Sequence, residues 1–155
     1  MRDKLALLSG IVESLLADAD AMLRAARSTH AAATHPESKP ENDKDTRGLE
    51  LAYLAGAQAG RAREIDLAVT EMRLLQPRPF TGERIAATAL VTVDDGDAET
   101  LYFLVPHGGG LRFGDTVVVT PPSPIGRALL GREEGDTVTV VLRGKSRDLT
   151  ITRVE

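Results

Sequence analysis

The residues of this sequence best suited to binding a metal ion or assisting a reaction are four carboxylates that lie close together in the sequence. They are Glu37, Glu41, Asp43 and Asp45. They lie in residues 34–45, where two prolines and a dense run of polar side chains predict a turn. On spacing alone, a solvated turn is favoured, with acids near the first turn of the next helix, because the helix dipole stabilises negative charge there.

Other kinds of reactive site find little support in the sequence. It contains no cysteine, which excludes disulfides, thiolate metal sites and cysteine nucleophiles. His30, His35 and His107 are scattered and lack the spacing of zinc ligands. His107 and the three glycines after it resemble the oxyanion loop of some esterases, but the sequence has no Gly-x-Ser-x-Gly motif. We therefore expect residues 107–110 to connect two strands.

The composition predicts a soluble cytoplasmic protein with an aliphatic core. The chain has 155 residues, of which 42% are hydrophobic and only 3% aromatic, with no tryptophan. Such a composition suits long alanine-rich helices and a small sheet better than an aromatic-lined pocket. The N-terminus does not resemble a signal peptide, and no apolar run approaches the ~20 residues of a membrane span. The net charge of −4 argues against a general nucleic-acid binder.

The carboxylates are expected at the tip of a pair of long helices. Apolar and small residues recur at intervals of three and four before the turn, which is typical of a helix that pairs along its length. This first seam consists of Leu5, Leu8, Val12, Leu15, Ala19, Met22, Ala26, Thr29 and Ala33. A second seam after the turn consists of Leu51, Ala55, Gln58, Ala62, Ile65, Val69 and Met72.

The sizes of the seam residues favour an antiparallel hairpin. The first seam runs from large to small side chains and the second from small to large, so antiparallel pairing matches their ends. Each arm of about 30 residues would be roughly 45 Å long. Two starts are open for the second helix: a capping box from Ser38 to Glu41, which we slightly prefer, or a later cap at Asp45 or Thr46.

Residues 80–155 predict a second, β-rich domain. The prolines at 77 and 79 end the helical pattern. Strands are expected at 85–93, 99–105, 115–120, 137–142 and 148–154, with an acidic turn at 94–97 and another turn at 144–146. Ser123 and Pro124 fit the start of one short helix and Gly131 its end. The expected class is α+β, with a coiled-coil hairpin at 1–76 (tip about 34–46) followed by a domain at 80–155.

Two motifs in the β-rich domain resemble a known family. Residues 123–131 (Ser-Pro-Ile-Gly-Arg-Ala-Leu-Leu-Gly) and 135–138 (Gly-Asp-Thr-Val) are similar to the C-terminal signature of bacterial Gre transcript-cleavage factors. Residues 60–65 (Gly-Arg-Ala-Arg-Glu-Ile) resemble the Gre pattern at a similar place in the second helix. The resemblance implies an FKBP-like fold for the second domain. A shared fold does not carry prolyl isomerase activity with it.

The resemblance also implies a function in transcription. Gre factors dock their globular domain at the rim of the RNA polymerase secondary channel, and we assign to this surface Ser123, Pro124, Ile125, Gly126 and Arg127. Acids at the coiled-coil tip then help the polymerase to hold a second Mg²⁺ and a water, so that the polymerase hydrolyses the 3′ end of a backtracked transcript. Glu41 and Glu37 are the first-choice acids and Mg²⁺ ligands, with Asp43 and Asp45 nearby. The protein would have no enzymatic activity, cofactor or stable nucleic-acid binding of its own, and would meet the RNA 3′ end only indirectly.

The tip departs from the family pattern, which leaves two alternatives. The Gre tip is acid-x-x-Glu-Asn, and Glu41-Asn42 matches its second half. Ser38 stands at the first acid, and Glu37 fits only with one extra residue. A Gre-like regulator that inhibits or modulates the polymerase without cleavage is the first alternative. A coiled-coil interaction adaptor unrelated to polymerase is the second.

Overall fold

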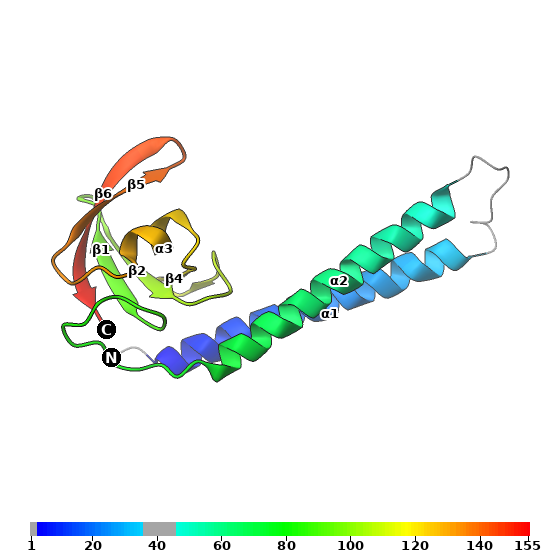
Figure 1. Cartoon of the computed structure of the whole chain (residues 1–155), viewed down its shortest axis with the longest axis horizontal. Coiled ribbons are helices and arrows are strands. Elements are labelled where there is room, and N and C mark those ends of the chain that lie inside the picture. Colours follow the sequence, from blue (N-terminus) through cyan, green and yellow to red (C-terminus); the bar gives the residue numbers. More distant parts are fainter. Residues whose placement is uncertain (1–2, 36–45) are drawn as a thin grey trace. The chain divides into compact units, whose positions relative to one another are not determined.

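The computed structural model describes residues 3–35 and 46–155 (Figure 1). Its elements are, in order, α1 (Lys4–Thr34), α2 (Arg47–Leu74), β1 (Leu90–Asp94), β2 (Glu99–Leu104), β3 (Arg112–Phe113), β4 (Thr116–Val119), α3 (Pro124–Leu129), β5 (Thr137–Leu142) and β6 (Lys145–Val154). The chain divides into two compact units. One is Val12–Glu71, and the other combines Met1–Ile11 with Met72–Glu155. Two long helices followed by a sheet with one short helix confirm the expected α+β class.

The predicted seams lie where α1 and α2 run antiparallel, side by side (Figure 1). Every seam residue predicted on α2 is buried or half-buried. Ala19 and Ala26 on α1, and Ala55 and Ala62 on α2, are all at most 7% exposed. Alanines buried to this extent require close approach of a neighbouring helix, as the small side chains of the seams predicted.

Two seam residues of α1 are exposed, contrary to the prediction. Leu5 is 64% exposed, and it lies in the first turn of the helix, at the end of the pairing. Met22 is 37% exposed. It lies between the buried Ala19 and Ala26 of the same seam.

Helix starts follow from local capping. Asp3 caps α1, since its Oδ1 accepts a hydrogen bond from the Ala6 N–H at 3.0 Å. α2 begins at Arg47, as the later alternative with a cap at Thr46 expects. Thr46 is not helical, its carbonyl oxygen accepts from the Glu50 N–H at 2.9 Å, and its hydroxyl donates to Glu50 Oε1 at 3.0 Å. The four residues from Ser38 to Glu41 lie outside the described part of the chain.

The β-rich unit is built on one six-stranded mixed sheet, in the order β3-β4-β2-β1-β6-β5. Neighbouring strands are antiparallel, except that β2 and β4 are parallel. The strands expected at 99–105, 115–120 and 137–142 are confirmed to within a residue or two. The core consists of Phe80, Ile85, Ala89, Val91, Val93, Leu104, Val119, Leu129, Val138, Val140, Leu149, Ile151 and Val154.

Three features of the sheet correct the predictions. Residues 85–89 are not strand, because Thr88 has a φ of +72° and Ile85 bonds instead to the loop after α3 through the Arg132 carbonyl at 2.8 Å. The last hairpin turns at Arg143-Gly144 rather than at 144–146, so that β6 begins at Lys145. The two-residue strand β3 was not expected.

The short helix α3 has the predicted ends. Ser123 is its N-cap, Pro124 occupies the first turn, and Gly131 follows with a φ of +76°. Leu129 is fully buried in the core. None of the helices within residues 3–35 and 46–155 combines the length and apolar character that crossing a membrane requires.

Candidate functional site

The predicted tip acids lie outside the part of the chain that the structure describes. Glu37, Glu41, Asp43 and Asp45 all belong to residues 36–45. Their role with Mg²⁺ therefore stays a prediction. The predicted docking residues all lie on or next to α3, beside a groove in the β-rich unit.

The corner before α3 is held by Ser123. Its hydroxyl donates to the carbonyl oxygen of Thr120 at 2.7 Å and accepts from the Gly126 N–H at 3.0 Å. Gly126 is buried in this corner. A capped first turn and a fixed connection from β4 give the residues of α3 defined positions.

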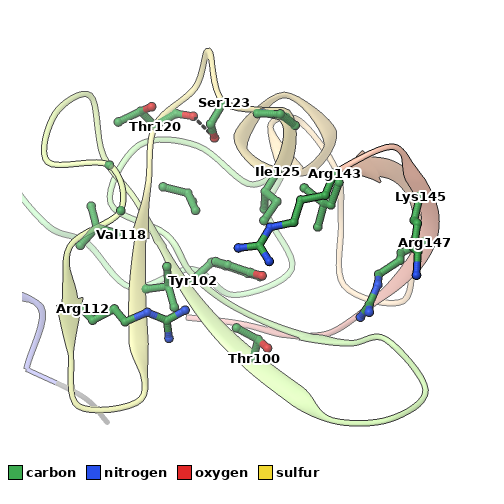
Figure 2. Close-up of a pocket in the computed structure, with 16 residues that line it drawn as sticks. Thr100, Tyr102, Arg112, Val118, Thr120, Ser123, Ile125, Arg143, Lys145 and Arg147 are labelled. Carbon is green, nitrogen blue, oxygen red and sulfur yellow. Dashed lines mark hydrogen bonds between the residues drawn. The ribbon is translucent and has the colours of Figure 1, made fainter.

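A groove of about 910 Å³ opens between α3, the strands β2 and β4, and the β5–β6 turn (Figure 2). Its lining residues are Thr100, Tyr102, Gly109, Gly110, Arg112, Val117, Val118, Val119, Thr120, Ser123, Pro124, Ile125, Leu142, Arg143, Lys145 and Arg147. Three of the five predicted docking residues, Ser123 to Ile125, are thus brought together with side chains from five strands, β2 to β6. Gly126 is buried beside them, and Arg127 is exposed and does not line the groove.

The floor of the groove is mostly apolar. Tyr102, Ile125 and Leu142 are half-buried and pack against the core. Burial raises the pKa of Tyr102, so its hydroxyl stays protonated at neutral pH and offers a hydrogen bond. An apolar floor with a few polar groups at its edge is the usual composition of a binding site.

Four cations stand around this floor: Arg112, Arg143, Lys145 and Arg147. Arg147 Nη1 donates to Asp95 Oδ2 at 2.8 Å. Hydrogen bonds from the Ala98 and Asp97 backbone N–H groups, and then the Arg147 side chain, lower the pKa of Asp95 and keep this carboxylate charged. The pair ties the β1–β2 turn to β6.

Sequence reasoning missed these cations, because it treated the segment around 144–146 only as a turn. One signal was available. Basic residues occupy every second position at 143, 145 and 147, and alternate residues of a strand share a face. Arg112 could not have been added, because the strand that carries it was not expected.

The acidic segment 94–97 is the hairpin turn that was expected. Asp94 Oδ1 accepts from the Gly96 N–H at 2.8 Å, and Gly96 has a φ of +88°. Across residues 3–35 and 46–155, no group of three or more His, Cys, Asp or Glu side chains is placed to hold a metal ion.

The β-rich unit matches a known family of domains. The family described as "Transcription elongation factor, GreA/GreB, C-term" matches residues 81–155. This range contains all six strands, α3 and every residue that lines the groove.

Individual relatives agree with this match. Transcription elongation factor GreA of Rhodospirillum rubrum is 31% identical over 98 residues, which cover 61% of this chain and 60% of the relative. The GreA of Brucella anthropi is 34% identical over 95 residues, which cover 59% of each protein. The chain thus spans about three fifths of the length of these relatives.

The solved structures similar to this chain include GreA factor homolog 1 of Thermus thermophilus. It is 17% identical, with a TM-score of 0.42 over 96% of this chain and 94% of that one. The Thermus aquaticus protein of the same name is 20% identical, with a TM-score of 0.43 over 95% and 92%. The sequence matches carry the comparison: residues 81–155 match the GreA/GreB C-terminal domain, and the chain is similar to GreA proteins over about three fifths of its length.

Proposed function

We propose that the protein is a transcription elongation factor that binds bacterial RNA polymerase through its secondary channel and stimulates cleavage of backtracked transcripts. The observation that carries the proposal is the GreA/GreB C-terminal domain at residues 81–155, preceded by two long antiparallel helices. In this proposal the β-rich unit docks on the polymerase through Ser123 to Arg127. The protein acts in the cytoplasm, where the polymerase works, and the polymerase performs the chemistry.

The helices supply the reach that this function needs. α1 has 31 residues and α2 has 28, so at ~1.5 Å per residue each extends over roughly 45 Å. The segment that joins them carries Glu37, Glu41, Asp43 and Asp45. Carboxylates are the oxygen ligands that Mg²⁺ accepts, which suits the tip for sharing an ion with the polymerase. A second Mg²⁺ bound there would activate the attacking water and stabilise the leaving oxygen.

A second function is favoured by the tip sequence. Ser38 stands where the Gre pattern has its first acid, and Lys39 and Lys44 place positive charge among the carboxylates. Those ammonium groups oppose binding of a cation. A factor that occupies the secondary channel and modulates the polymerase without cleavage is therefore the second candidate.

A cleavage assay on backtracked complexes tests both. Stalled RNA polymerase complexes would be incubated with the protein and Mg²⁺ while the RNA 3′ end is followed on a gel. Faster shortening that is lost in Glu41→Ala and retained in the matched control Glu13→Ala, an exposed acid of α1, supports cleavage. Binding without shortening supports the second candidate. If polymerase is not bound at all, both are wrong and the adaptor hypothesis is favoured.

A further inference from the structure

The groove beside α3 carries charge of one sign. Its four cations are Arg112, Arg143, Lys145 and Arg147, and no carboxylate is among the described residues that line it. The chain as a whole has a net charge of −4. Positive charge has therefore been concentrated at one place on an acidic protein, which is the distribution that attracts an acidic partner.

Two of these cations are available to a partner. Arg147 is already paired with Asp95 at 2.8 Å. The side chains of Arg143 and Lys145 are exposed, and neither side chain makes a hydrogen bond or an ion pair with any other residue that the structure describes. Figure 2 shows the guanidinium group of Arg143 pointing from the turn into the groove, toward Tyr102 and Ile125.

The backbone at Arg143 gives a second reason to look for a function there. Arg143 and Gly144 form the two-residue turn between β5 and β6, with φ values of +51° and +78°. Positive φ at both positions is the requirement of a type I′ turn, for which Asn-Gly is the favoured sequence. An arginine at this position is not explained by the turn, and its burial is too slight to explain it by packing.

The apolar floor of the groove indicates which side chains a partner would place there. Tyr102, Ile125 and Leu142 present a half-buried apolar surface that an apolar side chain would cover. Single-stranded nucleic acid is bound mainly on several aromatic platforms in a basic groove, and Tyr102 is the one aromatic side chain among the described lining residues. The groove therefore favours a protein segment over RNA.

We propose that this groove binds an acidic protein segment, which seats an apolar side chain on the Tyr102–Ile125 floor and sets carboxylates against Arg143 and Lys145. The proposal rests on the proposed function in one respect, because the polymerase would be the protein that supplies this segment. The recognition chemistry itself can be measured without the polymerase.

Binding of a labelled peptide to the full chain tests the proposal. The probe is a fluorescein-labelled peptide of alternating Glu and Leu residues, followed by anisotropy, with a second peptide in which Gln replaces every Glu. The wild-type protein should prefer the acidic peptide, and added salt should reduce that preference. Arg143→Asn/Lys145→Gln should weaken binding by about tenfold, since two exposed ion pairs are lost. Arg143→Asn also suits the turn, so loss of folding does not explain the result.

The matched control is Arg132→Gln/Arg153→Gln, which removes two exposed cations outside the groove. This variant should bind the acidic peptide as the wild type does. The proposal is overturned if both peptides bind equally, if the control variant loses as much affinity, or if a single-stranded RNA of equal charge binds more tightly through the same two residues. A parallel binding assay with core RNA polymerase separates this proposal from the proposed function. If the protein binds the acidic peptide but does not bind the polymerase, only the proposed function is wrong.

Discussion

The α-carbon of Gly126 lies against the carbonyl oxygen of Thr120. A Cβ atom at Gly126 would stand 2.0 Å from that oxygen and 2.7 Å from the carbonyl carbon. The same oxygen accepts hydrogen bonds from the Ser123 N–H at 3.0 Å and the Ser123 hydroxyl at 2.7 Å. The Ser-Pro-Ile-Gly motif thus forms one corner. Ser123 binds the carbonyl oxygen of Thr120, and only glycine at position 126 avoids a clash with that oxygen.

Gly126→Ala should therefore destabilise the β-rich unit. The added methyl group must displace backbone rather than a flexible side chain, and we expect a loss of about 3 kcal/mol in the free energy of unfolding. Urea denaturation followed by circular dichroism measures it. The matched control is Arg127→Ala, at the exposed neighbouring position, which should unfold as the wild type does. Equal midpoints for Gly126→Ala and the wild type would show that the corner yields easily.

Ser123→Ala should cost less than the glycine substitution. It removes the hydroxyl that accepts from the Gly126 N–H, and loss of an N-cap costs about 1 kcal/mol. Ser123→Thr keeps a hydroxyl and should recover most of the stability in the same denaturation experiment. If Ser123→Ala and Ser123→Thr lose equal amounts, the cap is not the source of the effect.

The hairpin could be predicted because its signals are local and repeated. Residues from Leu51 to Met72 recur at the spacing of a paired helix, and all seven of these α2 positions are buried or half-buried. The sequence left two starts open for the second helix, because Ser38 and Thr46 are each followed by a nearby acid, and α2 begins after Thr46. Local capping patterns fit both starts of the second helix, so they do not determine which one forms.

The groove could be predicted only in part, because it combines segments that are distant in the sequence. The α3 corner was visible through Ser123 and Pro124. Arg112 comes from the unexpected β3, and β2 lies beside the later strand β4 in a parallel pairing that no local pattern signals. Thr88 adopts a positive φ that its residue type disfavours, so the shortened first strand follows from tertiary contacts.

Two glycines in the long helices should respond to alanine in opposite ways. A Cβ at Gly10 of α1 would lie 2.7 Å from Phe113 Cε1, whereas a Cβ at Gly56 of α2 would meet nothing within 4 Å. Gly56→Ala should stabilise by about 1 kcal/mol through helix propensity. Gly10→Ala should gain nothing, or lose stability, because the Phe113 ring must move. Thermal unfolding of the two variants compares them directly, and equal gains would mean that the ring moves freely.

Gln58 weakens the seam of α2. Its Oε1 is buried and finds no hydrogen-bond partner among residues 3–35 and 46–155. Gln58→Leu removes this unsatisfied acceptor and should raise the free energy of unfolding by about 1 kcal/mol. Gln76→Leu, at an exposed position after the helix, is the control and should change little. A loss of stability in Gln58→Leu would indicate that the amide is satisfied in solution.

Asp95 should make stability depend on pH in the acid range. The N–H groups of Ala98 and Asp97 bond to its Oδ1 at 3.0 and 3.1 Å and lower its pKa below the usual 3.8, with a smaller effect from Arg147. Because the folded pKa lies below the unfolded one, the carboxylate contributes stability above the unfolded pKa and loses it as the pH falls through the folded pKa. The ¹³Cγ resonance of Asp95 should titrate below 3.8 in the wild type and, because the backbone bonds dominate, still below it in Arg147→Ala. Asp95→Asn should lose less stability than the wild type between pH 6 and pH 3. A wild-type midpoint at or above 3.8 would contradict this account of the turn.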